Sequence, residues 1–439
     1  MFQQEYRRKR ISAGGAAELV RSGDTLFLSG GALTPVDFAA ALYQQRERLS
    51  GVRVLNYLPL APLDFLLCPE GGAHFQVESV FYNRVQQAAA SRGFCDFIPN
   101  NLRDAARDWR TSTPDYDLMV FTVSPMDRHG YFTLAGSAIM ELELLGGAKR
   151  LIVEEAERAP RVFGDTLVHI SQVDGIIPSA RYPAVLPQAR ATAEDEALGR
   201  HVAGLVEDGS TIQLGFGGTI DALAGQLMDK RDLGIHTEAF SDAAMELLLA
   251  GAVNNRRKTL YPGLTVTSFT MGTERLYDYV NDNPSILHRA LSYTNNPGII
   301  AQNRKMTSIN AALQVDLSGQ CASESIGTRQ YSGSGGQVDT AVGAQMAEGG
   351  KSIITLRSTY TVKDPGTGEP VRKSRIVPRL DWGSTVTLPR ASTHFVATEY
   401  GAVCLRGLSL QARAKALISI AHPEFRPWLE EEAQKMRMQ

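Results

Sequence analysis

A short segment near the start of the chain returns in its second half, and this repeat restricts the fold more than any other feature of the sequence. Residues 20–28 read VRSGDTLFL and residues 206–214 read VEDGSTIQL. In both copies the hydrophobic run is followed by a glycine-rich turn and then by a helical pattern. Strand, glycine turn and helix in this order form the first part of a βαβ unit. The repeat therefore predicts a duplicated fold with two related open α/β domains.

Other segments agree with this fold class. Short runs rich in Val, Ile and Leu, separated by turn signals, occupy residues 51–58, 115–125, 149–156 and 173–178. Such runs are typical of strands buried on both faces of a parallel sheet. Residues 361–375, with Pro365, Gly366 and Gly368 at the tip, predict an exposed hairpin. Proline-punctuated chain passes into a charged helix start at 185–195, which predicts an N-terminal domain of residues 1–190 and a C-terminal domain of residues 191–439.

Charge and hydropathy argue against several kinds of partner. Lys and Arg number 45 against 47 Asp and Glu, so the formal net charge of -2 offers no field for nucleic acid or an anionic membrane. The longest uncharged run, residues 259–273, contains Pro262 and is shorter than the roughly 18 to 20 residues of a membrane-spanning helix. The basic start is not followed by the apolar stretch of a secretion signal. We therefore expect a cytoplasmic protein that binds neither nucleic acid nor a membrane.

The residues that commonly bind metals lack the required spacing. Four cysteines are far apart, without the paired two-residue spacing of a structural zinc site: Cys68, Cys95, Cys321 and Cys404. We expect them to be buried, reduced thiols. The segment His236-Thr237-Glu238 resembles the H-x-E of zinc deaminases, but no P-C-x-x-C follows to supply thiolate ligands. The sequence thus predicts no metal site.

Two glycine-rich segments resemble nucleotide-binding loops but miss a required glycine. The turn at residues 215–218 would need a further glycine where Ile220 stands to match a dinucleotide loop. Residues 349–352 read GGKS, but the first glycine of a phosphate loop would occupy the position of Gln345. No G-x-S-x-G segment supplies the nucleophile of a serine hydrolase. Nucleotide-dependent and serine-based chemistry are both disfavoured.

One acidic residue stands in an unusual setting. Glu238 lies after a predicted strand and before the predicted helix DAAMELLLAG. Backbone N–H groups near a helix start favour a carboxylate. A carboxylate that is kept dry and faces donors for a developing oxyanion can act as a covalent nucleophile, and glycine-rich turns supply such donors. The alternative is a solvated surface carboxylate, which most glutamates are.

A series of ordered motifs carries a family resemblance. They include VSPMDRHGYFTL in the first half, and QLGFGGTIDA, GIHTEAFSDA, NNPGIIAQN, ESIGTRQYSGSGGQVD, EGGKSIITL, SRIVP and VATEYGAVCLRG in the second. Together they resemble the acetyl-CoA hydrolase/transferase family, and within it most closely the 4-hydroxybutyrate CoA-transferases, with butyryl-CoA:acetate CoA-transferases as near relatives. The resemblance extends almost from end to end of the chain.

This resemblance implies a class I CoA-transferase with its active site in the crevice between two open α/β domains. It places Glu238 on the catalytic glutamate of the family. Such an acyl-CoA:carboxylate CoA-transferase moves CoA between acetyl- or succinyl-CoA and a short-chain carboxylic acid through a glutamyl-CoA thioester, in ping-pong order. The family implies no permanently bound cofactor, because the coenzyme A thioester is itself a substrate. It also suggests a homodimer.

Two further groups of residues match family segments. Near the reacting carbonyl, the resemblance assigns the oxyanion and acyl pocket to Gly215, Phe216, Gly217 and Gly218. Near the pantetheine arm and thiol end of CoA, it assigns binding to Asn295, Gly335, Gly336 and Gln337. The turn departs from the family pattern G-I-G-x-I-P by having Phe216 and no proline, so we expect an acyl pocket of different shape. From the residues alone, both groups are also compatible with ordinary tight turns.

Arg357 departs from the family pattern in a way that bears on the acid. Where relatives continue with Pro-Ser-Thr-Ala, this chain has Arg357-Ser-Thr-Tyr360. A guanidinium suits bidentate recognition of a second carboxylate, which predicts a dicarboxylate such as itaconate or succinate. The alternative is a surface arginine that faces solvent. Two further alternatives are an acyl-CoA hydrolase of the same ancestry, which would need no added carboxylate, and a catalytically silent CoA-binding protein.

Overall fold

The computed structural model describes residues 2–187, 190–215, 218–364 and 366–438. The chain folds into two compact units. The first unit contains the chain up to Pro187, and two later segments return to it, Ala239–Ser241 and Val266–Thr294. The second unit contains the rest of the chain. A single boundary at residue 190, as predicted from the sequence, does not describe these two returns.

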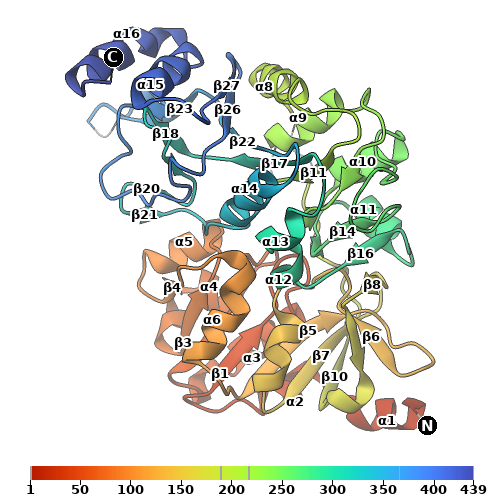
Figure 1. Ribbon diagram of the computed structural model, residues 1–439. Coiled ribbons are helices and arrows are strands. Elements are labelled where there is room, and N and C mark those ends of the chain that lie inside the picture. Colours follow the sequence, from red (N-terminus) through yellow and green to blue (C-terminus); the bar gives the residue numbers. More distant parts are fainter. Residues whose placement is uncertain (1, 188–189, 216–217, 365, 439) are drawn as a thin grey trace. The chain divides into compact units, whose positions relative to one another are not determined.

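The first unit is built around a seven-stranded sheet (Figure 1) in which all neighbouring strands are parallel. In spatial order the strands are β10 (Gly175–Ser179), β7 (Leu151–Ala156), β5 (Leu118–Val123), β1 (Thr25–Leu28), β2 (Val52–Leu55), β3 (Phe75–Ser79) and β4 (Cys95–Phe97). Every residue of β5 and of β7 is buried. These central strands therefore have the continuous hydrophobic runs of a sheet covered on both faces.

Short helices and strands complete the first unit. The helices are α1 (Phe2–Lys9), α2 (Ala13–Ala17), α3 (Val36–Gln44), α4 (Asp64–Leu67), α5 (Arg84–Ala90), α6 (Ala105–Ser112), α7 (Glu141–Leu144), α11 (Glu274–Val280) and α12 (Leu291–Thr294). The strands are β6 (Tyr131–Thr133), β8 (Phe163–Gly164), β9 (Leu167–His169), β13 (Ala239–Phe240), β14 (Thr265–Thr267), β15 (Phe269–Thr270) and β16 (Ile286–His288).

The second unit has a six-stranded sheet of similar design. In spatial order the strands are β12 (Gly234–Ile235), β11 (Thr211–Leu214), β17 (Met306–Ala311), β22 (Lys351–Thr355), β26 (Phe395–Thr398) and β27 (Gly401–Cys404). The first five are parallel and β27 is antiparallel to β26. Helix α14 (Gln337–Met346) packs on β17 and β22, as Figure 1 shows.

The other elements of the second unit are short. Its remaining helices are α8 (Ala193–Ala203), α9 (Gly218–Gln226), α10 (Asp242–Leu249), α13 (Pro297–Ile300), α15 (Leu410–Ser419) and α16 (Arg426–Lys435). Its remaining strands are β18 (Gln314–Asp316), β19 (Cys321–Ala322), β20 (Ser325–Ile326), β21 (Arg329–Gln330), β23 (Thr359–Lys363), β24 (Pro370–Ser374) and β25 (Ile376–Val377). Strands β23 and β24 form the hairpin predicted for residues 361–375, although the predicted tip residue Pro365 lies outside the described residues.

The repeat in the sequence corresponds to equivalent strands of the two sheets. Strand β1 lies in the first copy, residues 20–28, and β11 lies in the second copy, residues 206–214. Strand β1 is followed by a helix and then by β2, β3 and β4 on one side, before β5 returns to its other side. Strand β11 is followed by a helix and then by β12 on one side, and β17 lies on its other side. Strand order therefore reverses beside β1 and again beside β11, and ligands of open α/β sheets bind at such points, outside the carboxyl ends of the strands. The predicted duplicated α/β fold is confirmed.

The cysteines agree only in part with the prediction of buried thiols. Cys95 and Cys321 are buried, and Cys68 is partly buried. Cys404 is exposed, so the prediction is wrong there: it is the last residue of β27, at the edge of its sheet, where the strand leaves the packed core. All four are free cysteines. In the part of the chain that the structure describes, no helix is long and apolar enough to cross a membrane.

Candidate active site

Glu238 lies just past the carboxyl end of β12, within the second unit. His236 and Thr237 connect it to that strand, and all three belong to the segment singled out from the sequence. The hydroxyl of Thr237 donates to the Leu214 carbonyl oxygen at 3.2 Å and accepts from the Leu214 N–H at 3.3 Å. This pair of bonds fixes the glutamate segment beside the end of β11. Glu238 therefore stands at the point where the strand order of the sheet reverses.

Described residues on two segments donate hydrogen bonds to the Glu238 carboxylate. The Asn295 amide donates from Nδ2 to Glu238 Oε2 at 2.6 Å. The backbone N–H of Gly336 also donates to the carboxylate. Gly336 is the residue that precedes α14, so this N–H belongs to the start of a helix, where unpaired donors favour negative charge. The sequence had assigned Glu238, Asn295 and Gly336 to one site, and the structure brings these three together.

Only glycine fits at position 336. A Cβ atom on Gly336 would overlap Glu238 Oε2 and would lie 2.5 Å from Asn295 Nδ2. Because these neighbours are the carboxylate and its amide donor, a larger residue would displace one of them. Gly335 precedes it with a φ of 56°, which is left-handed backbone that favours glycine. The glycine pair thus lets the start of α14 approach the carboxylate closely.

The surroundings of Glu238 raise its pKa to about 7. Burial is the largest cause, because removal from water disfavours the charged form. The hydrogen bond from Asn295 lowers the pKa, the charge of the nearby Asp339 raises it, and the bond from Gly336 lowers it. Asp339 is fully buried in the first turn of α14 and had not been predicted as a site residue, although it belongs to the motif SGSGGQVD. At neutral pH the carboxylate is therefore close to its midpoint of ionisation.

Two buried acceptor atoms have no partner among the described residues, one on Asn295, which holds the carboxylate, and one on Gln337, which follows Gly336 in the chain. Asn295 is fully buried, and its Oδ1 atom accepts no hydrogen bond. Gln337 is 4% exposed, and its Oε1 atom likewise accepts none, while its Nε2 donates to the Ala311 carbonyl at 3.5 Å. Buried polar atoms normally form hydrogen bonds. Two buried acceptors without a partner therefore indicate a place where a ligand donates hydrogen bonds. Both residues belong to the predicted CoA-binding group.

The predicted oxyanion turn is described only at its ends. Gly215 follows β11 and donates its N–H to the Ile309 carbonyl at 3.0 Å. Gly218 is the first residue of α9. Phe216 and Gly217 lie outside the described residues. The role of this turn in binding the acyl group stays a prediction.

Arg357 has a carboxylate partner within the chain. Its Nε donates to Asp195 Oδ1 at 2.9 Å, and its Nη2 donates to Asp195 Oδ2. Asp195 is fully buried at the start of α8, where its carboxylate also accepts from the N–H and hydroxyl of Thr192 at 3.0 Å each. The bidentate fork of Arg357 is thus occupied, which counts against the predicted role in binding a second carboxylate. That role stays a prediction.

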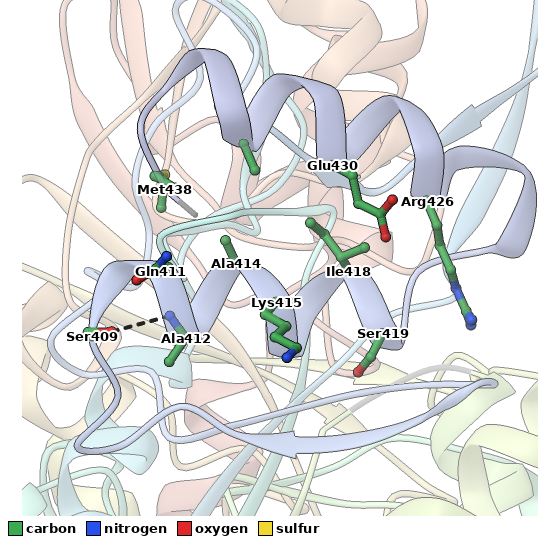
Figure 2. Close-up of a pocket in the computed structure, with 11 residues that line it drawn as sticks. Ser409, Gln411, Ala412, Ala414, Lys415, Ile418, Ser419, Arg426, Glu430 and Met438 are labelled. Carbon is green, nitrogen blue, oxygen red and sulfur yellow. Dashed lines mark hydrogen bonds between the residues drawn. The ribbon is translucent and has the colours of Figure 1, made fainter.

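A further pocket lies elsewhere in the second unit, away from the predicted site residues. Figure 2 shows a pocket of about 720 Å³ between α15 and α16, lined by Ala414, Ile418 and Arg426 among others. None of the predicted site residues lines it. Within the described ranges, no group of three His, Cys, Asp or Glu side chains is arranged to hold a metal ion.

Comparison with known proteins matches this site to a family. The chain matches the acetyl-CoA hydrolase/transferase N-terminal domain over residues 1–187 and the C-terminal domain over residues 272–433. It is 42% identical to a succinyl-CoA:cyclohexane-1-carboxylate CoA transferase of Geobacter metallireducens, covering 99% of this chain and 97% of the relative. It is 36% identical to a 4-hydroxybutyrate coenzyme A transferase of Clostridium kluyveri, covering 99% of each.

A solved structure agrees over the whole length. RipA from Yersinia pestis superposes with a TM-score of 0.93 at 36% identity, covering 100% of both chains. The chain therefore belongs to the acetyl-CoA hydrolase/transferase family, as the sequence motifs had indicated. It is a CoA-transferase, an enzyme of acyl-CoA metabolism that acts on CoA thioesters and carboxylates. The acids named for its relatives differ from one another, so the family does not identify the acid.

Proposed function

We propose that this enzyme moves CoA between acetyl-CoA and a short-chain monocarboxylic acid, with Glu238 as the covalent nucleophile, and succinyl-CoA is the alternative donor. The observation that carries the proposal is the partly buried Glu238 carboxylate, held between the Asn295 amide and the Gly336 N–H. A carboxylate with a pKa of about 7 is ionised in part at neutral pH and is more nucleophilic than an ordinary surface glutamate.

The reaction proceeds by two exchanges at carbonyl carbons. A carboxylate oxygen of Glu238 attacks the thioester carbonyl, the carbon–sulfur bond breaks, and CoA leaves as a thiolate. The resulting mixed anhydride is attacked at its glutamyl carbonyl by the same thiolate, which releases the first acid as a carboxylate and leaves a glutamyl-CoA thioester. A second carboxylate reverses these steps. No proton, electron or metal is consumed, because each step exchanges one acyl bond for another.

The donors that hold Glu238 also serve the reaction. When the glutamyl carbonyl is attacked, negative charge develops on its oxygen, next to the Asn295 Nδ2–H and the Gly336 N–H. Preorganised donors of this kind stabilise an oxyanion without reorganisation at the moment of reaction. The unpaired acceptors Asn295 Oδ1 and Gln337 Oε1 suit the amide N–H groups of the pantetheine arm of CoA. In this proposal the thiol end of CoA binds at the start of α14.

The proposal of a monocarboxylate acceptor rests on the ion pair between Arg357 and Asp195. A second carboxylate on the acid costs several kcal/mol to bury unless a cation or several donors meet it. Arg357, which was predicted for that task, already pairs with Asp195. Three relatives are named for the monocarboxylates cyclohexane-1-carboxylate, 4-hydroxybutyrate and butyrate, although the first of them and a fourth relative are also named for succinyl-CoA. Itaconate or another dicarboxylate is the alternative acceptor, and a homodimer remains the expected assembly.

The test is a transfer assay over a panel of acids. Purified enzyme is given acetyl-CoA or succinyl-CoA with acetate, butyrate, 4-hydroxybutyrate, cyclohexane-1-carboxylate, succinate or itaconate, and each new CoA ester is measured. We expect efficient transfer to at least one monocarboxylate and parallel double-reciprocal plots. Thioester loss at the same rate without any added acid would instead identify an acyl-CoA hydrolase. Intact mass after incubation with acyl-CoA alone should show a CoA adduct on the Glu238 peptide, and its absence with every donor would contradict the covalent route.

A further inference from the structure

Arg375 is a partly buried arginine that has no carboxylate partner among the described residues. It lies between β24 and β25, and its backbone is fixed on both sides: its N–H donates to the Ser358 carbonyl at 2.8 Å and its carbonyl accepts from Val315 at 2.9 Å. Its Nη1 donates to the Leu313 carbonyl at 2.8 Å, and its guanidinium lies 4.9 Å from the ring centre of Tyr360. The side chain is therefore held in one place by neutral groups.

Arg375 differs from neighbouring arginines in its hydrogen-bond partners. Arg357 pairs with Asp195, and Arg372, three residues earlier on β24, pairs with Glu424 at 3.3 Å. Arg375 makes one side-chain hydrogen bond, to Leu313, although a guanidinium has five N–H donors. Burial is the largest cause that lowers its pKa, Tyr360 and Tyr331 raise it, and the positive charge of Arg357 lowers it, whereas no Asp or Glu of the described residues is among these causes. A buried cation without a counterion is costly, which indicates an anionic ligand.

A second cation lies on the same face of the hairpin. Lys373 is the cross-strand partner of Tyr360 in the β23–β24 register, and paired residues of an antiparallel ladder point to the same side. Lys373 is two residues before Arg375, so the two side chains extend to one face, where Tyr360 also lies. Lys373 is exposed and forms no ion pair within the described part of the chain. Two cations and an aromatic ring therefore line one surface.

This surface lies along the same edge of the sheet as Glu238. Leu313 and Ser358, which fix Arg375, come two and three residues after the carboxyl ends of β17 and β22. Glu238 follows β12, and β11 separates β12 from β17. At about 4.8 Å between neighbouring strands, the ends of β12 and of β17 or β22 are roughly 10 to 14 Å apart. The backbone segments that carry Glu238 and fix Arg375 are thus farther apart than the two carboxylates of a four-carbon acid, and Glu238 is not among the causes of the pKa shift of Arg375.

We propose that Arg375, assisted by Lys373, binds a phosphate group of the CoA moiety while the thioester lies at Glu238. This inference rests on the proposed function. A fork of N–H donors binds a phosphate by two parallel charge-assisted hydrogen bonds, and the lysine adds a second charge. The second carboxylate of a short acid is the other source of an anion, but a few carbon atoms do not span the separation from Glu238. The pantetheine arm of CoA does.

The test compares ligands that differ in their phosphates. Binding of CoA, 3′-dephospho-CoA and pantetheine is measured by calorimetry for the wild type, Arg375→Met, Arg375→Lys and the control Arg372→Met. We expect Arg375→Met to weaken CoA binding about tenfold or more and to leave pantetheine binding unchanged, because pantetheine carries no phosphate. Arg375→Lys should lose less, and Arg372→Met should bind CoA like the wild type. In turnover, Arg375→Met should raise the KM for acyl-CoA and leave kcat within about twofold.

Several outcomes would overturn the proposal. An equal loss for CoA and pantetheine would make Arg375 structural, and an equal loss in Arg372→Met would make the effect one of general charge. A loss confined to dicarboxylate acids would assign the arginine to the acid instead. If Arg375→Met does not melt cooperatively, Arg375→Lys and Lys373→Met decide, and unchanged CoA affinity in both would overturn the proposal. A wild type that binds CoA through Arg375 but transfers none would contradict the proposed function alone, since binding is measured without turnover.

Discussion

The two units contain the same kind of sheet, and each has a glutamate whose pKa is raised to about 7, yet the two carboxylates have different surroundings. Glu154 on β7 is 2% exposed and accepts from the N–H groups of Phe38 at 3.0 Å and Asp37 at 3.4 Å, in the first turn of α3. It therefore caps a helix. Glu238 accepts from the Asn295 amide and the Gly336 N–H, and the Oδ1 atom of Asn295 has no partner in the described part of the chain.

The difference shows that a raised pKa does not by itself identify a catalytic group. Burial is the largest cause of the shift for both residues. Glu154 lines a pocket of about 320 Å³ at the carboxyl edge of its sheet. Burial and a nearby cavity therefore do not distinguish the catalytic glutamate from the structural one. The two differ in their neighbours: helix N–H groups satisfy Glu154, whereas the Asn295 amide that holds Glu238 has an acceptor without a partner among the described residues. The predictions below test how Glu154 and Glu238 differ, and the last one tests the preference between acids.

The largest effect is expected from the glutamates themselves. Glu238→Gln keeps the shape of the side chain but removes the nucleophile, so transfer should fall by about 10³-fold or more. Glu154→Gln should keep transfer within about threefold, because an amide can still accept from the two N–H groups of α3. The rate of CoA exchange between acetyl-CoA and butyrate measures both. More than a few per cent of activity in Glu238→Gln would remove the distinction.

Gly336→Ala should have the next largest effect. The added Cβ overlaps the Glu238 carboxylate and crowds Asn295 Nδ2, so it displaces a donor of the oxyanion site. Loss of one such donor typically lowers kcat by about 10² to 10³. The matched control is Gly225→Ala in α9, where a Cβ meets nothing within 4 Å, and which should retain full activity. Equal kcat values in the two variants would show that the start of α14 does not need to approach the glutamate.

The pH dependence of the first half-reaction should report the pKa of Glu238. Formation of the enzyme–CoA adduct requires the ionised carboxylate, so its rate should fall about tenfold for each pH unit below 7. Asp339→Asn removes a negative charge that raises this pKa, and the midpoint should therefore move to lower pH. Rapid-quench mass measurements from pH 5 to 8 would follow both. A wild-type midpoint near 4.5 would mean that Glu238 is solvated like a surface residue.

Glu154 should instead affect stability. Its pKa rises from 4.5 to about 7 on folding, so between these pH values the folded state binds more protons than the unfolded state. The wild type should therefore lose roughly 1 to 3 kcal/mol of unfolding free energy relative to Glu154→Gln as the pH rises from 4.5 to 7. Denaturant unfolding at several pH values measures this difference. A difference that stays constant would mean that the Glu154 carboxyl is not buried in the folded protein.

The sequence predicted the fold well because its signals are local and repeated. The strand, glycine turn and helix around residues 20–28 and 206–214 needed no tertiary information, and both strands lie where the strand order reverses. The returns of residues 239–241 and 266–294 to the first unit were missed, because short stretches of chain that cross between units leave no periodic signal. Glu238, Asn295 and Gly336 were grouped through family motifs, since their spacing in the sequence carries no sign of contact.

The partner of Arg357 shows the limit of such reasoning most directly. Asp195 lies far before Arg357 in the sequence, and nothing in either segment indicates that α8 begins beside the end of β22. Arg357, which stands where the chain departs from the family motif, was therefore assigned to the substrate. Arg375, which has no carboxylate partner in the part of the chain that the structure describes, lies in the common motif SRIVP and was not predicted. Long-range ion pairs decide which cations are free for ligands, and only the folded chain reveals them.

The smallest effect is expected for the preference between acids in Arg357→Met. Because the guanidinium binds Asp195, its loss leaves a fully buried carboxylate without its cation, and the protein should become less stable by roughly 1 to 3 kcal/mol. The ratio of kcat/KM for itaconate to that for butyrate should change by less than about twofold, since both acids meet the same surroundings at Glu238. Asp195→Asn is the matched control and should lower stability in the same way with the same unchanged ratio. A loss of about tenfold or more for itaconate alone, in Arg357→Met and not in Asp195→Asn, would show that the arginine leaves Asp195 to bind a second carboxylate, and would restore the dicarboxylate as the preferred acid.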